Sequence, residues 1–308
     1  WGSHEVYPGQ NKRLDLGDPQ YTGAGNVVLY KYNNNAWVQA GIIYGIGSND
    51  RFGQLVRIVD NASITKDGET YTTLVVLTGG MSDIAAITSY FGISSLESNA
   101  GYVIIYGWNR TNDTFHIIDM FHGTASAEAR GNNGLDITSN GLTIVSGSAH
   151  PSPSNAEDNK GIKVHHWDPI SEKYIEINNS TPLTMPTSDL YSYTCVISAD
   201  GEVLVGSKNF NGSGQNPAEV RIYDLHRGGA PITASSTYVL ERSFNSTDVF
   251  NAMFSSGSMP SGSNFGGGHF GDSVRLNSDG SVLAILSSTI PRAPQYAYQK
   301  MRVVLHVY

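Results

Sequence analysis

The chain has 308 residues, 15% of them charged, and a formal net charge of −8. A nucleic-acid-binding protein needs a basic surface that neutralises phosphates, and no Lys/Arg cluster occurs here, so we expect no nucleic-acid partner. No apolar run approaches the roughly 20 residues of a membrane-spanning helix, so we also expect no membrane span. A content of 34 glycines and 17 tyrosines favours strands and turns over helices.

Short runs of β-formers follow one another along the whole chain. In order, we expect strands at residues 25–32, 36–39, 52–59, 73–77, 101–108, 114–118, 134–137, 142–147, 161–167, 173–177, 190–197, 203–206, 218–223, 238–241, 270–276, 282–285 and 301–308. Between them lie polar stretches at 79–100, 148–160, 207–217 and 255–268. Such stretches predict loops, where binding sites usually lie.

Four of these connections share one turn chemistry. Asp-Gly or Asn-Gly pairs end at Gly68, Gly141, Gly201 and Gly280. These pairs tolerate the positive φ angles that a two-residue hairpin turn requires. Each pair therefore predicts a β-hairpin, and a second strand pair follows each hairpin.

The repeating unit is thus a four-stranded antiparallel sheet. Units of this kind repeated along a chain are typical of β-propeller blades, so we expect one all-β propeller domain over residues 1–308. Five blades are favoured, six or seven stay open because residues 80–100 and 243–268 have room for divergent blades, and a β-sandwich is the alternative fold. The last unit has three strands, and an N-terminal strand at 12–17 is a candidate to complete it.

Two segments carry a more specific pattern. Phe270-Gly271 and Phe52-Gly53 each precede an alternating strand, and the segment from Gly25 to Trp37 has the glycine, tyrosine and tryptophan spacing of a second half-repeat. These residues resemble the integrin-like FG-GAP β-propeller repeat. The copies at 134–147 and 190–206 lack the Phe-Gly pair, and the Gly-Ala-Pro part is absent. The resemblance implies an extracellular or surface-exposed protein that acts in adhesion, ligand binding or assembly.

The resemblance also raises the question of calcium, which such blades often hold in an Asp-rich loop. The nearest stretch here contains Asn155, Glu157 and Asn159, which offer oxygen ligands at alternating positions. The glycine falls one place late and a closing glutamate is missing, so a solvated acidic loop is the alternative. We expect no other cofactor.

Asn-x-Ser/Thr sequons are candidate glycosylation sites in a secreted protein. They all fall in expected turns or loops, at Asn61, Asn109, Asn112, Asn178, Asn179, Asn211 and Asn245.

Three tryptophans occupy related places in successive units. Aromatic rings stack on sugars, so Trp37, Trp108 and Trp167 are candidate ligand-binding residues. The alternative is that they are repeated packing positions between blades.

No constellation of catalytic residues is visible. Cys195 lies in an alternating strand and is expected to be buried, and His165-His166 point to opposite faces of a strand. His122 and His150 lie near loops. The sequence contains no His-Glu-x-x-His and no Gly-x-Ser-x-Gly motif.

From these features we expect a secreted protein, or one on a cell or virion surface, without enzyme activity. It would be a structural or adhesive subunit whose partners are further copies of itself, as in a filament or surface array, or surface glycans. A carbohydrate-binding lectin is the first alternative. A propeller hydrolase or lyase is the second, and it would require several acids, histidines or arginines gathered at the axis.

Overall fold

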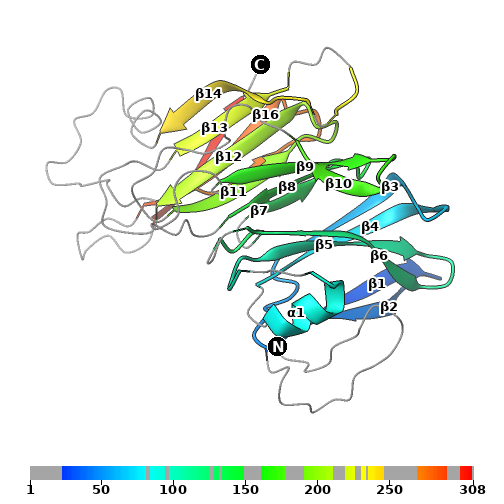
Figure 1. Ribbon diagram of the computed structural model, residues 1–308. Helices are drawn as coiled ribbons and strands as arrows, with labels where there is room; N and C mark the ends of the chain where they lie inside the picture. The colour runs from blue at the N-terminus through cyan, green and yellow to red at the C-terminus, as the bar shows by residue number, and fades with distance from the viewer. Residues whose placement is uncertain are drawn as a thin grey trace, which may run out of the picture.

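The computed structural model describes a chain built almost entirely of antiparallel strands (Figure 1). The residues that it describes are 23–80, 84–93, 97–124, 128–131, 134–148, 161–177, 191–210, 219–225, 230–233, 235–245, 269–289 and 299–306. Within them the strands form five sheets of two, four, four, four and three strands, each made of strands consecutive in the chain. The expectation of an all-β fold with four-stranded antiparallel sheets is therefore confirmed.

The strands lie close to where the sequence predicts them. The first sheet holds β1 (Asn26–Asn33) and β2 (Ala36–Tyr44), and the second holds β3 (Val56–Lys66), β4 (Glu69–Gly79), β5 (Tyr102–Asn109) and β6 (Thr114–His122). The third holds β7 (Gly134–Ile137), β8 (Thr143–Gly147), β9 (Ile162–Asp168) and β10 (Lys173–Glu176). The fourth holds β11 (Tyr191–Ile197), β12 (Val203–Phe210), β13 (Glu219–Asp224) and β14 (Val239–Asn245), and the last holds β15 (His269–Leu276), β16 (Val282–Thr289) and β17 (Gln299–His306).

The glycine turns explain why the hairpins form where they do. Gly68, Gly141, Gly201 and Gly280 all have φ between 75° and 82°. A side chain at such an angle is strained, so glycine is the natural residue at each turn. The first strand of the second sheet is longer than expected, because β3 runs through residues 60–64 as an irregularity in its pairing with β4 rather than leaving the sheet in an insertion.

One element was not expected. Residues 84–91 form the short helix α1 (Ile84–Phe91) in the connection between β4 and β5. Within its described part, the region 80–100 therefore holds a helix rather than the divergent blade that the sequence left open. Ile87 of this helix is fully buried and packs with the core between the first two sheets.

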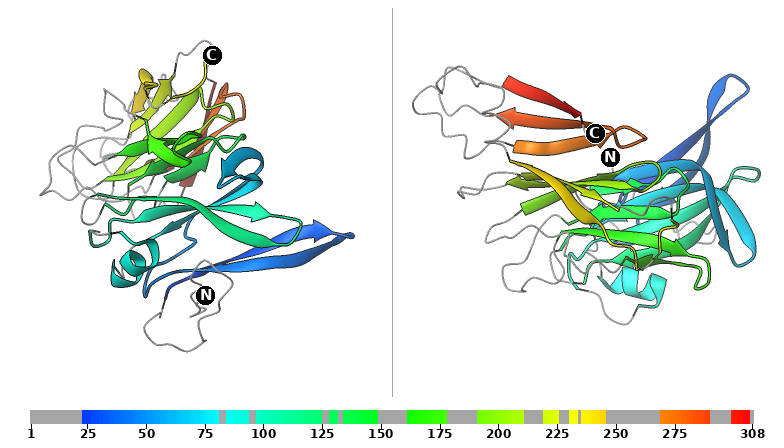
Figure 2. Two further views of the ribbon diagram at one scale, coloured as in Figure 1. Left: turned by 45° about the vertical axis from the view of Figure 1, so that its right-hand side comes forward. Right: turned by 90° about the horizontal axis from the view of Figure 1, so that it is seen from above.

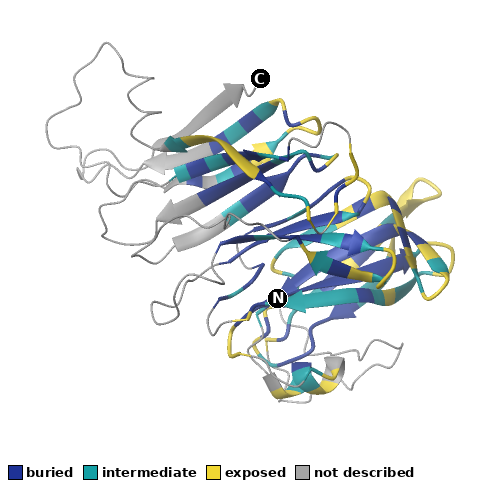
Figure 3. Ribbon diagram, turned by 45° about the horizontal axis from the view of Figure 1, so that its top comes forward, coloured by how far each residue is buried: buried dark blue, intermediate teal, exposed yellow. Residues whose placement is uncertain are grey.

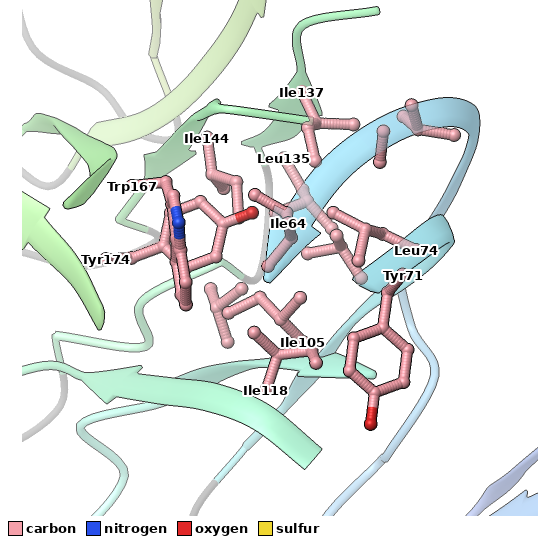
Figure 4. Packing of buried hydrophobic residues seen from close by; sticks show 14 residues of the cluster. Ile64, Tyr71, Leu74, Ile105, Ile118, Leu135, Ile137, Ile144, Trp167 and Tyr174 are labelled. Atoms are coloured by element: carbon pink, nitrogen blue, oxygen red, sulfur yellow. The ribbon is translucent and has the colours of Figure 1, made fainter. Parts of the chain in front are cut away.

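Successive sheets pack face to face, in an arc that runs from the blue hairpin β1–β2 to the orange and red sheet β15–β17 (Figure 2). Four apolar clusters fill the spaces between neighbouring sheets. The cluster between the second and third sheets combines Ile64, Leu74 and Ile105 with Ile144 and Trp167 (Figure 4). Buried positions accordingly run through the middle of the sheets, while exposed ones gather at hairpin tips (Figure 3).

The first strands of the last four sheets lie in a row, each in contact with the next. Strand β7 contacts β3 and β11, and β11 contacts β15, so these four strands converge. We call the row formed by β3, β7, β11 and β15 the inner edge. Backbone hydrogen bonds tie its turns together, from Ser139 N to Ala199 O at 2.9 Å and from Ala199 N to Ser278 O at 2.8 Å.

Candidate functional site

The inner edge brings together charged residues that are far apart in the chain. Arg57, Asp136, Val196 and Arg275 hold equivalent places on β3, β7, β11 and β15, because they pair across the hairpin with Val76, Val145, Val205 and Ala284. Three of these four positions are charged. We call Arg57, Asp136 and Arg275 the inner-edge cluster.

Arg57 and Asp136 form an ion pair between two sheets. The Arg57 Nε donates to Asp136 Oδ1 at 3.2 Å, and the second oxygen of Asp136 accepts the backbone N–H of Ile197 at 3.1 Å. The two side chains are 31% and 22% exposed, so solvent and small solutes reach them. One carboxylate thus links three sheets and remains accessible.

Arg275 repeats the local geometry of Arg57 on the last sheet. Its Nη1 donates to the carbonyl of Val274 at 2.7 Å, as the Nη1 of Arg57 donates to the carbonyl of Val56 at 3.0 Å. Arg275 is exposed. The inner edge therefore carries two guanidinium groups, which bind carboxylates and phosphates well. That of Arg57 contacts the carboxylate of Asp136, and that of Arg275 lies two sheets further along the row.

A second group of polar residues lies close by but is closed to solvent. Glu128 and Arg130 are 2% and 1% exposed and form a buried ion pair through Glu128 Oε1 and Arg130 Nη2. Arg130 also donates to the carbonyls of Ser146 at 3.2 Å and Gly161 at 2.9 Å, and Glu128 accepts the N–H of Thr124 at 2.8 Å. This pair ties the β6–β7 connection to strand β8 and to the β8–β9 connection, and it has a structural role.

His165 belongs to the same buried region. Its ring stacks on Phe121 with centroids 3.7 Å apart, and its Nδ1 has no hydrogen-bond partner among the described residues. Burial, and then the positive charges of Arg130 and Lys163, hold the pKa of His165 well below its ordinary value. The imidazole is therefore neutral at pH 7, and its burial separates it from any substrate.

The single cysteine is not a nucleophile. Cys195 is 1% exposed on β11, as the sequence predicts. Burial, and then the negative charge of Asp136, raise the pKa of its thiol far above the ordinary value. A reactive cysteine needs the opposite environment, since the thiolate is the attacking form.

The three tryptophans fall into two classes. Trp108 and Trp167 are 5% and 4% exposed and pack in the clusters between sheets, with ring centroids 5.4 Å from Phe115 and 5.2 Å from Tyr174. They are the packing residues that the alternative interpretation expects, and they cannot stack on a ligand. Trp37 differs, because it is 70% exposed near the tip of the hairpin β1–β2.

The remaining candidates are dispersed or lie elsewhere in the chain. Asn61 is exposed on β3, Asn109 and Asn112 lie at the β5–β6 hairpin tip, and Asn245 ends β14, so their glycosylation stays a prediction. Asn178, Asn179, Asn211 and the calcium candidates Asn155, Glu157 and Asn159 lie outside the described residues, as does His150. The Nδ1 of His122 lies 2.6 Å from the carbonyl of Gly123. In the part of the chain that the structure describes, no three His, Cys, Asp or Glu residues are close enough to hold a metal ion, and no helix is long and apolar enough to cross a membrane.

Sequence reasoning missed the inner-edge cluster, although one signal was present. In both Phe-Gly segments an arginine follows the phenylalanine by five residues, Arg57 after Phe52 and Arg275 after Phe270. Asp136 carries no comparable mark. Its role depends on the side-by-side placement of β3 and β7, which are separated in the chain by strands β4, β5 and β6.

No protein-family model and no curated protein matches the chain. Among solved structures it is similar to a provisional 6-phosphogluconolactonase of Bacteroides fragilis, at 12% identity and a TM-score of 0.40, over 92% of this chain and 65% of that one. It is similar to the periplasmic gluconolactonase PpgL of Pseudomonas aeruginosa at 9% identity and a TM-score of 0.34, over 98% of this chain and 81% of that one. A third similar chain comes from a study of two prolyl endopeptidases, at 12% identity and a TM-score of 0.31, over 82% of this chain and 28% of that one.

These comparisons correct the function that the sequence suggested. The similar structures are enzymes, and none is an integrin-like adhesion protein. The prediction of a non-enzymatic structural or adhesive subunit is therefore wrong. At these identities and scores the similarity assigns no reaction to the chain, so its chemistry has to be argued from its own residues.

Proposed function

We propose that the chain is a hydrolase of the propeller type that acts on a small anionic ester or lactone at the inner edge. The observation that carries this proposal is the accessible ion pair between Arg57 and Asp136, 3.2 Å apart on two converging strands, with Arg275 at the equivalent place on the last sheet. A gathering of acids and arginines at the axis is what the hydrolase alternative requires.

The roles follow from the chemistry of the groups. Asp136 takes a proton from water as the water oxygen attacks the carbonyl carbon, and it returns that proton to the alkoxide when the ester C–O bond breaks. Arg57 donates to the oxyanion that forms on the carbonyl oxygen. Arg275 binds the anionic group of the substrate and so orients it. The proposal includes a closed ring of five blades, in which the first strand of each blade faces this site.

Acid release from a panel of carboxylic esters and lactones, with and without a second anionic group, tests the proposal. We expect Asp136→Asn to lower kcat by about 10²-fold or more, the usual contribution of a general base. Arg275→Gln should raise KM for the anionic substrates and leave the neutral ones unchanged. Glu176→Gln is the control, because it removes the exposed ion pair with Lys163 on the outer strands β9 and β10.

Two results would contradict this function. One is a wild-type protein that hydrolyses no member of the panel above the blank rate. The other is an Asp136→Asn variant with wild-type rates, which would leave the ion pair a purely structural link between three sheets. Thermal unfolding of each variant separates loss of chemistry from loss of fold.

A further inference from the structure

The hairpin β1–β2 presents an apolar face to solvent. Val28, Tyr30 and Tyr32 alternate along β1 and are 38%, 54% and 58% exposed, while their neighbours Val27 and Leu29 point into the core. Trp37, paired with Tyr32 and with its ring centroid 5.4 Å from it, is exposed beside them. Apolar side chains of this size, gathered on one strand face, indicate an interaction surface.

Internal equivalence shows what kind of surface this is. The pairing of β1 with β2 shifts register between Leu29 and Tyr30, and the pairing of β5 with β6 shifts register between Ile105 and Tyr106. Beyond the shift, each hairpin has one cross-strand pair of aromatic residues, Tyr32 with Trp37 and Trp108 with Phe115. Val28, Tyr30 and Tyr32 therefore correspond to Ile104, Tyr106 and Trp108.

In every later sheet with this face described, the face is buried against the preceding sheet. Ile104, Tyr106 and Trp108 are 0%, 5% and 5% exposed and pack on β1–β2. In the third sheet Trp167 packs on the second, and in the fourth sheet Tyr223, which follows the same register shift, packs on the third. The exposed face of β1–β2 is thus equivalent to the face that each of these later sheets buries against the sheet before it.

The last sheet has the complementary face. On the second, third and fourth sheets the residues Val76, Val145 and Val205 are fully buried against the sheet that follows. Ala284 is their equivalent on β16, since it pairs with Arg275 as they pair with Arg57, Asp136 and Val196. Ala284 is only half-buried, and no sheet among the described residues follows β15–β17 to cover it.

We propose that the face of β1–β2 formed by Val28, Tyr30 and Tyr32 docks on the sheet β15–β17 of the same chain, and that this contact closes the arc of sheets. The occupant follows from continuity: each sheet interface joins one sheet to the next, and among the described sheets these two faces are the ones at the ends of the series. Closure buries Tyr30 as Tyr106 and Tyr223 are buried. It also holds Arg275 in a fixed place relative to Arg57 and Asp136.

Cross-linking tests which surface covers Tyr30. Packed sheets lie about 10 Å apart, so a bis-maleimide of that span should join cysteines placed at the two faces. We expect Tyr30→Cys combined with Ala284→Cys to give a cross-link within one molecule, identified by peptide mass in the monomer fraction. The native Cys195 does not interfere, because it is buried. Leu240→Cys combined with Ala284→Cys is the control and should give no cross-link, since Leu240 is 46% exposed on the outermost strand β14.

A second measurement does not depend on a reagent. Tyr30→Asp should lower the melting temperature by about 5 °C, because it buries a charge in the closed ring, while Leu240→Asp should leave it nearly unchanged. The proposal is overturned if the cross-link joins two molecules, which assigns the face to a second copy, or if it does not form. It is also overturned if Tyr30→Asp leaves the melting temperature unchanged. If that variant keeps its melting temperature and loses binding to a glycan array, the face is a ligand-binding surface and not a contact between sheets.

Discussion

The turns that lead into β3 and β7 have the same backbone conformation but bury different kinds of side chain. Phe52 N donates to Ala24 O at 2.8 Å, and Arg130 N donates to Ala100 O at 2.7 Å. The glycine after each has φ near 80°, 82° at Gly53 and 79° at Gly131. The N–H of Gly53 donates at 2.8 Å to Thr78 O near the end of β4, and that of Gly131 donates at 2.8 Å to Gly147 O at the end of β8. Arg130 thus occupies the place that Phe52 holds one sheet earlier.

An acidic residue lies two positions before each of these side chains, Asp50 before Phe52 and Glu128 before Arg130, and the two acids have different partners. Asp50 is fully buried and accepts a hydrogen bond from the hydroxyl of Tyr102, a neutral donor. Glu128 pairs instead with the guanidinium of Arg130. The comparison teaches that backbone hydrogen bonds and one glycine define this turn, while the buried side chain varies from an aromatic ring to a charged group, provided that the charge is paired.

The largest expected effect comes from breaking the buried pair. Glu128→Gln leaves the Arg130 charge buried without its counter-ion and should lower the free energy of unfolding by about 3–5 kcal/mol in urea titration. Asp60→Asn, which breaks the exposed pair with Arg110, should cost no more than about 1 kcal/mol. The double variant Glu128→Gln/Arg130→Met should lose less free energy of unfolding than the two single variants lose together. Strictly additive losses would show that the two residues do not act as a pair.

The shared backbone predicts a similar cost at both glycines. Gly131→Ala combines a strained φ with a Cβ only 2.7 Å from Thr78 Cγ2, and Gly53→Ala meets Val27 in the same way. Each should cost about 2–4 kcal/mol. Gly68→Ala has a similar φ but open space around it, so strain alone should cost about 1 kcal/mol. Equal losses at Gly68 and Gly131 in thermal unfolding would contradict the role of close packing.

The neighbourhood of Arg130 also predicts that stability depends on pH. His165 has a lowered pKa in the folded chain, so its contribution to stability is fully present above the unfolded pKa of about 6.5 and is lost as the pH falls below it. The loss should approach about 1.4 kcal/mol per pH unit. Urea titrations of wild type and His165→Phe at pH 7.5 and 5.5 measure it. Parallel losses in the two proteins would show that His165 is not the responsible group.

The smallest effect is expected at Ser146. Its Oγ is buried without a hydrogen-bond partner among the described residues, whereas its backbone carbonyl accepts from Arg130. Ser146→Ala keeps that carbonyl and removes an unsatisfied hydroxyl, so we expect a change within about 1 kcal/mol, in the stabilising direction. A loss of 2 kcal/mol or more would indicate an essential contact of the hydroxyl group.

Much of the fold was predictable, because it depends on neighbours in the chain. Asn140-Gly141 and Asp279-Gly280 predicted two-residue hairpin turns. The hairpins form there with positive φ at both glycines, but the loops are longer, since the last ladder pairs are Ile137–Ile144 and Leu276–Leu283. Asp279, in the best-preserved hairpin, accepts from Ser281 at 2.6 Å, which lowers the pKa of its carboxyl and marks it as a turn residue. The repeat of tryptophans was also a packing signal at Trp108 and Trp167.

The candidate site was not predictable, because its residues meet only when the sheets stack. Arg57 and Asp136 lie on strands that share no hydrogen-bonded ladder, and nothing around Asp136 in the sequence marks it as the partner of an arginine. The burial of Arg130 was equally hidden, since Arg130-Gly131 lacks the phenylalanine that marks this place in Phe52-Gly53. Tyr30 and Tyr106 look alike in sequence, yet one is exposed and the other buried.

The sequence by itself determined the strands, their turns and the four-stranded unit, since these rest on alternation and on glycine at positive φ within a few residues. The tertiary structure alone decided which faces are buried, that an arginine fills a phenylalanine's place beside Glu128, and that two charged residues from different sheets form an accessible pair. These outcomes depend on the stacking of sheets, which brings together residues that no local rule of turn or strand formation relates.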